Sequence, residues 1–157
     1  MQVLIEQHFI SDLAIVIENE CIKNIIPKAM IHNHLPAQHY ELPHQHYLVP
    51  GFIDLHIHGT HGRDVMDATA ESLLAMSRTL AADGVTGFLA TTMSASSDAI
   101  DAALKNIAAM RANKEGAAIL GAHLEGPFIS KTNCGAQCSD HVRLPDINLL
   151  QKWQEAN

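Results

Sequence analysis

The sequence contains only three cysteines, Cys21, Cys134 and Cys138. Their odd number and their spacing fit neither a disulfide framework nor a close zinc-ribbon pattern. Cys134 and Cys138 could form a metal pair, but we favour free thiols in a loop, which is the usual state in a reducing compartment.

Positive charge and long apolar segments are also scarce. Lys and Arg total 10 against 17 Asp and Glu, and the formal net charge is −7. The basic residues are scattered, which argues against nucleic acid or an acidic membrane surface as a partner. Apolar runs such as residues 13–17 and 117–120 are too short to cross a bilayer, and residues 1–10 lack the features of a signal peptide. We therefore expect a cytoplasmic protein.

The composition is that of a globular protein, 47% hydrophobic and 17% charged. Residues 2–10, 13–18 and 21–26 are short segments rich in Val and Ile, separated by turns, and they predict a small antiparallel sheet. Residues 28–47 have little periodicity and read as an exposed connection. This connection holds five histidines, which could bind metal, although a solvated loop is the favoured reading: His32, His34, His39, His44 and His46.

From residue 52 onward, strand and helix patterns alternate. Strands are predicted at residues 52–58, 85–93 and 117–124, and helices at 69–82, with Thr69 as N-cap, and after Ser96 or Ser97. A further helix is expected within residues 145–157. Repeated strand–helix units predict a parallel sheet with right-handed crossovers, and thus an α/β fold.

The most informative segment is residues 49–59, where His56 and His58 follow an apolar run. Residues two apart on a strand share a face, so both imidazoles can project from the carboxyl end of the first strand. Two neutral imidazoles presented together are the beginning of a divalent metal site.

Residues 49–59 resemble the first barrel strand of the amidohydrolase superfamily. Residues 123–128, with the sequence His-Leu-Glu-Gly-Pro-Phe, resemble the signature of the N-acetylglucosamine-6-phosphate deacetylase family. Four more segments fit the same family: residues 64–67, 83–86, 135–137 and 142–145.

This resemblance implies an incomplete (β/α)8 barrel. We expect its first three βα units in residues 51–157, preceded by part of a small antiparallel β domain and the His-rich connection in residues 1–50. A complete barrel of this type needs about 250 residues, whereas the chain has 157. The chain would be the amino-terminal portion of such an enzyme, and alone we expect it to be inactive and poorly soluble.

The resemblance also implies a reaction and a substrate. The expected function is metal-dependent deacetylation of N-acetylglucosamine 6-phosphate, or of its galactosamine counterpart, in amino-sugar catabolism. The alternatives are another metal-dependent amidohydrolase, such as a cyclic amidase or dihydroorotase relative, and a non-catalytic remnant. The expected partner is a small amino-sugar phosphate, and full-length relatives are expected to be homo-oligomers.

Site residues follow from the same resemblance. Glu125, His56 and His58 are the expected ligands of one or two divalent ions, with Zn or Fe favoured, while His123 is either a supporting donor or a packed core histidine. No catalytic residue is assigned in this chain, because the general base is expected beyond Asn157.

Substrate contacts are expected in the loop after residue 128. Ala136 and Gln137 match the loop that binds the amino-sugar phosphate, although many relatives carry His where this chain has Gln137. An amide can donate a hydrogen bond but cannot become cationic. Asp140, His141 and Arg143 are candidates for phosphate contacts, with a solvated loop as the equal alternative.

Overall fold

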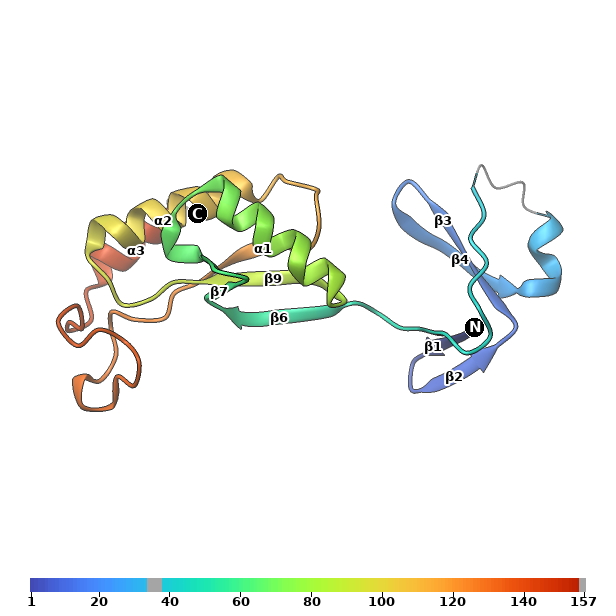
Figure 1. Ribbon diagram of the computed structural model, residues 1–157, viewed down its shortest axis with the longest axis horizontal. Coiled ribbons are helices and arrows are strands. Elements are labelled where there is room, and N and C mark those ends of the chain that lie inside the picture. The colour runs from blue at the N-terminus through green and yellow to red at the C-terminus, as the bar shows by residue number, and fades with distance from the viewer. Residues whose placement is uncertain (34–37, 156–157) are drawn as a thin grey trace. The chain divides into compact units, whose positions relative to one another are not determined.

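The computed structural model of the protein describes residues 1–33 and 38–155. Contacts divide the chain into two compact units, Met1–Pro50 and Gly51–Asn157, which are drawn in Figure 1. Residues 34–37 of the His-rich connection, which include His34 and Pro36, lie outside the described residues. Reading the units as a small β domain and the start of a barrel stays a proposal.

The first unit is built from short strands. β1 (Gln2–Ile5) pairs antiparallel with β2 (His8–Ser11), and β3 (Leu13–Glu18) pairs antiparallel with β4 (Cys21–Pro27). The segment expected as one strand over residues 2–10 is therefore a hairpin, with Glu6 in the left-handed region at φ 54°. The antiparallel pairing is as expected from the sequence, but the four strands lie in two separate sheets and not in the single sheet that was predicted.

The connection after β4 has more structure than the sequence indicated. It contains a 3-10 helix, η1 (Lys28–Asn33), and a two-residue strand, β5 (Tyr47–Leu48), which pairs parallel with β1. Parallel pairing over two residues leaves no periodic signal, which is why this strand could not be read from the sequence.

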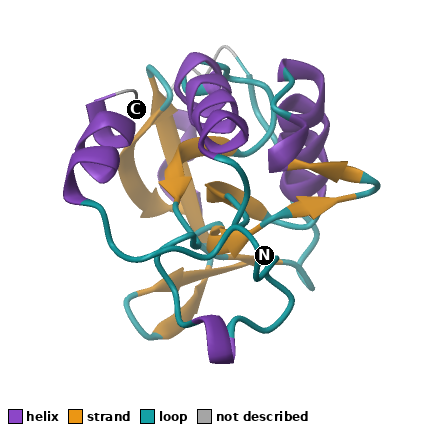
Figure 2. Ribbon diagram, turned by 90° about the vertical axis from the view of Figure 1, so that its left-hand side faces the viewer, coloured by secondary structure: helices purple, strands orange, loops and turns teal. Residues whose placement is uncertain are grey.

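The second unit has an α/β fold with a parallel sheet, as predicted. Its strands lie in the order β10–β9–β6: β6 (Phe52–Ile57), β9 (Val85–Thr91) and β10 (Ala118–His123). Its helices are α1 (Ala70–Ala82), α2 (Ser97–Met110) and α3 (Ile147–Glu155), drawn in purple in Figure 2. Shorter elements are β7 (Gly59–Thr60), β8 (Arg63–Asp64), η2 (Val65–Asp67) and η3 (Lys131–Asn133).

Side-chain caps fix where the two long helices begin. The hydroxyl of Thr69 accepts a hydrogen bond from Ser72 N at the start of α1, and Ser96 accepts one from Ala99 N at the start of α2. These bonds satisfy amide groups that have no partner within the helix. Thr69 was predicted as a cap from the sequence, and of the two candidates Ser96 and Ser97 it is Ser96 that caps α2.

The core of this unit lies between the sheet and its helices, on the face of β6 and β9 that α1 and α2 cover in Figure 1. Phe88 and Ala90 from β9 are fully buried there, together with apolar residues of all three helices. These include Leu73, Met76, Ile100, Leu104, Ile107 and Trp153. Across residues 1–33 and 38–155, no helix combines the length and apolar character needed to cross a membrane.

Candidate metal centre

The carboxyl end of β6 departs from regular strand geometry. Asp54 pairs with Phe88 and Ile57 pairs with Ala90, so β6 advances three residues while β9 advances two. Residues paired across neighbouring strands project from the same face. Asp54 and Ile57 therefore share the helix-covered face with Phe88 and Ala90. The extra residue lies between them, at Leu55 and His56.

This bulge decides where the histidines point. In a regular continuation of the ladder, His56 would pair with Ala90 and project toward the helices. The bulge instead turns His56 to the opposite face, and His58, two residues later, follows it. Bulges re-aim side chains in this way next to active sites.

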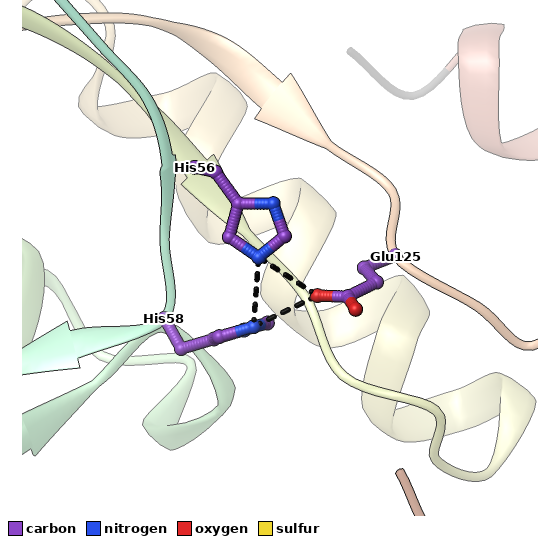
Figure 3. Close-up of side chains that lie close together, drawn as sticks. All are labelled: His56, His58 and Glu125. Carbon is purple, nitrogen blue, oxygen red and sulfur yellow. Dashed lines mark hydrogen bonds and ion pairs between the residues drawn. The ribbon is translucent and has the colours of Figure 1, made fainter. Parts of the chain in front are cut away.

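His56, His58 and Glu125 meet on that face. Nε2 of His58 lies 2.8 Å, and Nε2 of His56 2.9 Å, from Oε2 of Glu125, and the two nitrogens are 3.2 Å apart. Figure 3 shows both rings and the carboxylate directed toward one another, the histidines from the end of β6 and Glu125 from the segment after β10. Within the described part of the chain, they are the one group of three or more His, Cys, Asp or Glu side chains close enough together to hold a metal ion.

The contacts of Glu125 fit coordination of a cation better than hydrogen bonds. The side chain is 31% exposed, yet Oε2 itself is buried and has no hydrogen-bond partner of acceptable geometry, in spite of the two nearby nitrogens. A buried carboxylate oxygen without a partner is costly. Zn²⁺ takes imidazole nitrogens and carboxylate oxygens at about 2.0–2.2 Å in a tetrahedral arrangement, which sets ligand atoms about 3.3–3.6 Å apart. The three atoms, 2.8–3.2 Å apart, are a few tenths of an ångström closer than this, and their residue types fit a divalent ion.

A hydrogen bond to the backbone of β9 orients His58 for metal binding. Nδ1 of His58 lies 3.1 Å from the carbonyl oxygen of Thr91, so Nδ1 carries the hydrogen and donates this hydrogen bond. Nε2, which faces Glu125, then keeps a free lone pair. Metal-bound histidines are commonly fixed by such a bond from the other ring nitrogen.

The segment after His58 anchors its backbone. Val65 N donates to the carbonyl of His58 at 2.8 Å, at the start of η2. Asp64 and Asp67 form a capping box around η2, and Asp67 Oδ2 accepts from Asp64 N and from Ser72 Oγ. The backbone hydrogen bond from Asp64, followed by the Ser72 hydroxyl, lowers the pKa of Asp67. Residues 64–67, one of the segments that resemble the deacetylase family, thus connect the backbone of His58 to α1.

Two more histidines lie near the site, His123, considered above from the sequence, and His61 in the loop after β6, and they have different positions. His123 packs at right angles to His56, with ring centroids 4.7 Å apart, and its Nδ1 lies 3.1 Å from the carbonyl oxygen of Leu55. It is therefore a neighbour of the ligand group and not a core histidine. His61 is exposed, and its Nδ1 lies 3.1 Å from the Thr60 hydroxyl.

The loop after β10 brings Gln137 to a buried position, where it is 7% exposed. Its Oε1 accepts from Ser94 N, and its Nε2 contacts Met93 Sδ at 3.3 Å. The amide thus joins this loop to the residues that follow β9. Ala136, its neighbour, is exposed. The substrate roles of Ala136 and Gln137 stay predictions.

The other residues of this loop are more accessible. Arg143 donates to the Ser97 hydroxyl at 2.9 Å, at the first residue of α2. Asp140 is exposed and His141 half-buried, while Cys134 and Cys138 are free thiols, as expected. Sequence reasoning missed two residues that support the site, Asp54 within β6 and Thr91 at the end of β9. Only Thr91 carried a signal, its place at a strand end.

Comparison with known proteins agrees with these observations. The model of the amidohydrolase family matches residues 47–155. The chain is 40% identical, over 96% of its length, to the N-acetylglucosamine-6-phosphate deacetylase of Bacillus subtilis (strain 168), and covers 41% of that protein. It is 42% identical, over 67% of its length, to the N-acetylgalactosamine-6-phosphate deacetylase of Escherichia coli O157:H7, and covers 28% of it.

Among solved structures, the chain resembles that of N-acetylglucosamine-6-phosphate deacetylase from Thermotoga maritima. The TM-score is 0.71 at 33% identity, over 88% of this chain and 34% of the other. The chain therefore spans about two fifths or less of the length of these relatives. Since the family model covers more than half of the sequence, the chain belongs to the amidohydrolase family.

Proposed function

We propose that this protein deacetylates an N-acetylhexosamine 6-phosphate, with N-acetylglucosamine 6-phosphate as the favoured substrate, at a divalent metal centre. The observation that carries the proposal is the convergence of His56, His58 and Glu125 within 3.2 Å of one another. The deacetylases named above support the substrate class. Residues 51–157 are then the opening βα units of a (β/α)8 barrel.

The reaction adds water across an amide C–N bond and yields acetate and a free amine. A divalent ion held by His56, His58 and Glu125 would lower the pKa of a bound water and polarise the acetamide carbonyl, and Zn or Fe suits these ligands. His58 is held by Thr91 with its lone pair toward Glu125. The two imidazoles and the carboxylate thereby direct three ligand atoms toward one place.

The substrate loop belongs to the same proposal. We propose that the loop at Ala136 and Gln137 serves the amino-sugar phosphate. Since the Gln137 amide is already bonded to Ser94 and Met93, it would act by holding the loop in place. Exposed polar residues beside it, such as Asp140, remain candidates for direct contact.

The test is acetate release by the intact, metal-loaded protein. We expect N-acetylglucosamine 6-phosphate to react far faster than N-acetylglucosamine, and chelation of the metal to abolish the reaction. Faster reaction of N-acetylgalactosamine 6-phosphate would favour the epimer instead. Bound metal without acetate release from any of these sugars would contradict the proposal and favour a different amidohydrolase.

A further inference from the structure

Three backbone groups of the bulge in β6 are bonded to side chains. Asp54 Oδ1 accepts from His56 N at 3.0 Å, and Thr91 Oγ1 accepts from Ile57 N at 3.0 Å. The carbonyl oxygen of Leu55 accepts from His123 Nδ1 at 3.1 Å. The irregular backbone is thus supported by residues of all three strands of the sheet.

His123 makes the longest reach of the three. It stands at the end of β10, which is separated from β6 by β9. His123 pairs with Thr91, so its ring lies on the sheet face opposite the helices, which we call the open face. There the ring extends across β9, and its Nδ1 donates to the carbonyl oxygen of Leu55. The same ring then packs against the ring of His56 at a centroid distance of 4.7 Å.

Removing these hydrogen bonds would lower the stability of the bulge relative to a regular strand. An unpaired backbone amide costs about 1–3 kcal/mol when it is shielded from water, which applies to Ile57 N, whose bond to Thr91 is partly buried. The bonds of His56 N and of the Leu55 carbonyl are exposed, so losing either of them costs less. A regular ladder would satisfy the same groups without help from side chains, but it would turn His56 toward Ala90 and the helices. The position of His56 therefore depends on the bonds that stabilise the bulge.

We propose that His123 is a positioning residue of the metal centre, which holds the bulge of β6 through Leu55 and thereby orients His56 toward Glu125. Thr91 has the same role through Ile57. The inference rests on the proposed function, since it takes His56, His58 and Glu125 as ligands. His123 itself lies outside the ligand group.

The experiment measures Co²⁺ affinity and the Co²⁺ ligand-field spectrum in the intact protein, because the spectrum reports the geometry of the ligands. His123→Ala should weaken binding by about 10–100-fold, the range found for residues that orient metal ligands, and should alter the spectrum. His123→Asn keeps a donor at the position of Nδ1 and should bind within about threefold of wild type, with the native spectrum. His8→Asn, at an exposed position in β2 of the first unit and outside the His-rich connection, is the matched control.

A second pair of variants tests the same bulge without changing a histidine. Thr91→Val preserves the shape of the side chain but removes the acceptor for Ile57 N, so it should weaken Co²⁺ binding, whereas Thr91→Ser should retain it. This pair keeps the inference testable if His123→Ala fails to fold.

The outcomes are distinguishable. Wild-type affinity and spectrum in both His123→Ala and Thr91→Val would overturn the positioning role. An Asn variant as weak as the Ala variant would also overturn it, because packing and not the hydrogen bond to Leu55 would then be responsible. A wild-type protein that binds no Co²⁺ would contradict the proposed metal centre itself.

Discussion

The two faces of the β6–β9–β10 sheet differ in burial and in the side chains that they carry. On the face toward the helices, Phe88 and Ala90 are fully buried and Ile119 is 4% exposed. On the opposite face, Leu55 is 62% and Leu120 43% exposed, and the candidate metal ligands lie at its carboxyl end. Packing is concentrated on one face and polar chemistry on the other, and a one-residue bulge decides which face receives His56.

The largest effect on stability should come from the packed face. Phe88→Ala removes a fully buried ring and should lower the free energy of unfolding by about 3–5 kcal/mol. The control is Leu55→Ala on the open face, which should change it by about 0.5 kcal/mol or less. Urea unfolding of the intact protein, followed by far-ultraviolet circular dichroism, measures both. Equal losses would remove the contrast between the faces.

A smaller effect should come from the bond that ties α1 to the start of β10. Ser77 is fully buried, and its hydroxyl donates to the carbonyl oxygens of Ala117 and Glu115. Ser77→Ala leaves these acceptors without that donor and should cost about 1–3 kcal/mol. Ser130→Ala, at an exposed hydroxyl, should be nearly neutral in the same unfolding experiment. A neutral Ser77→Ala would show that the helical layer is held by apolar contacts alone.

The smallest effect concerns Asp67, which links the segment after His58 to α1. Its lowered pKa means that folding favours the ionised carboxylate. This contribution is present above the unfolded value of about 4 and is lost as the pH falls through the folded pKa. Asp67→Asn should therefore lower the melting temperature slightly at pH 7, and the difference from wild type should shrink toward pH 3. A difference that is constant with pH would contradict this assignment.

Much of the fold could be predicted because its signals are local. The caps at Thr69 and Ser96 precede their helices directly, and the alternation of strands and helices gives the parallel sheet. The meeting of His56 and His58 with Glu125 followed from their places at strand ends, since the carboxyl ends of parallel strands lie together. Their role as metal ligands stays a prediction.

The bulge could not be predicted, because its supports are remote in sequence. Strict alternation would place Asp54 and His56 on one face, but the register separates them. Thr91 and His123 stabilise this register from 34 and 68 positions away along the chain. The burial of Gln137 was missed for the same reason, since its partners Met93 and Ser94 lie in another loop.

The most direct test of the account is Zn²⁺ binding to the intact protein at equilibrium, compared between Glu125→Gln and Glu115→Gln. Glu115 is an exposed carboxylate of the same unit, paired with Arg78, and its variant should bind Zn²⁺ as wild type does. Glu125→Gln replaces an anionic ligand and should weaken Zn²⁺ binding by at least about 100-fold, the upper end of the effect reported even for groups that only orient ligands. Equal Zn²⁺ affinity in the two variants would contradict the central claim that Glu125 completes a metal centre with His56 and His58.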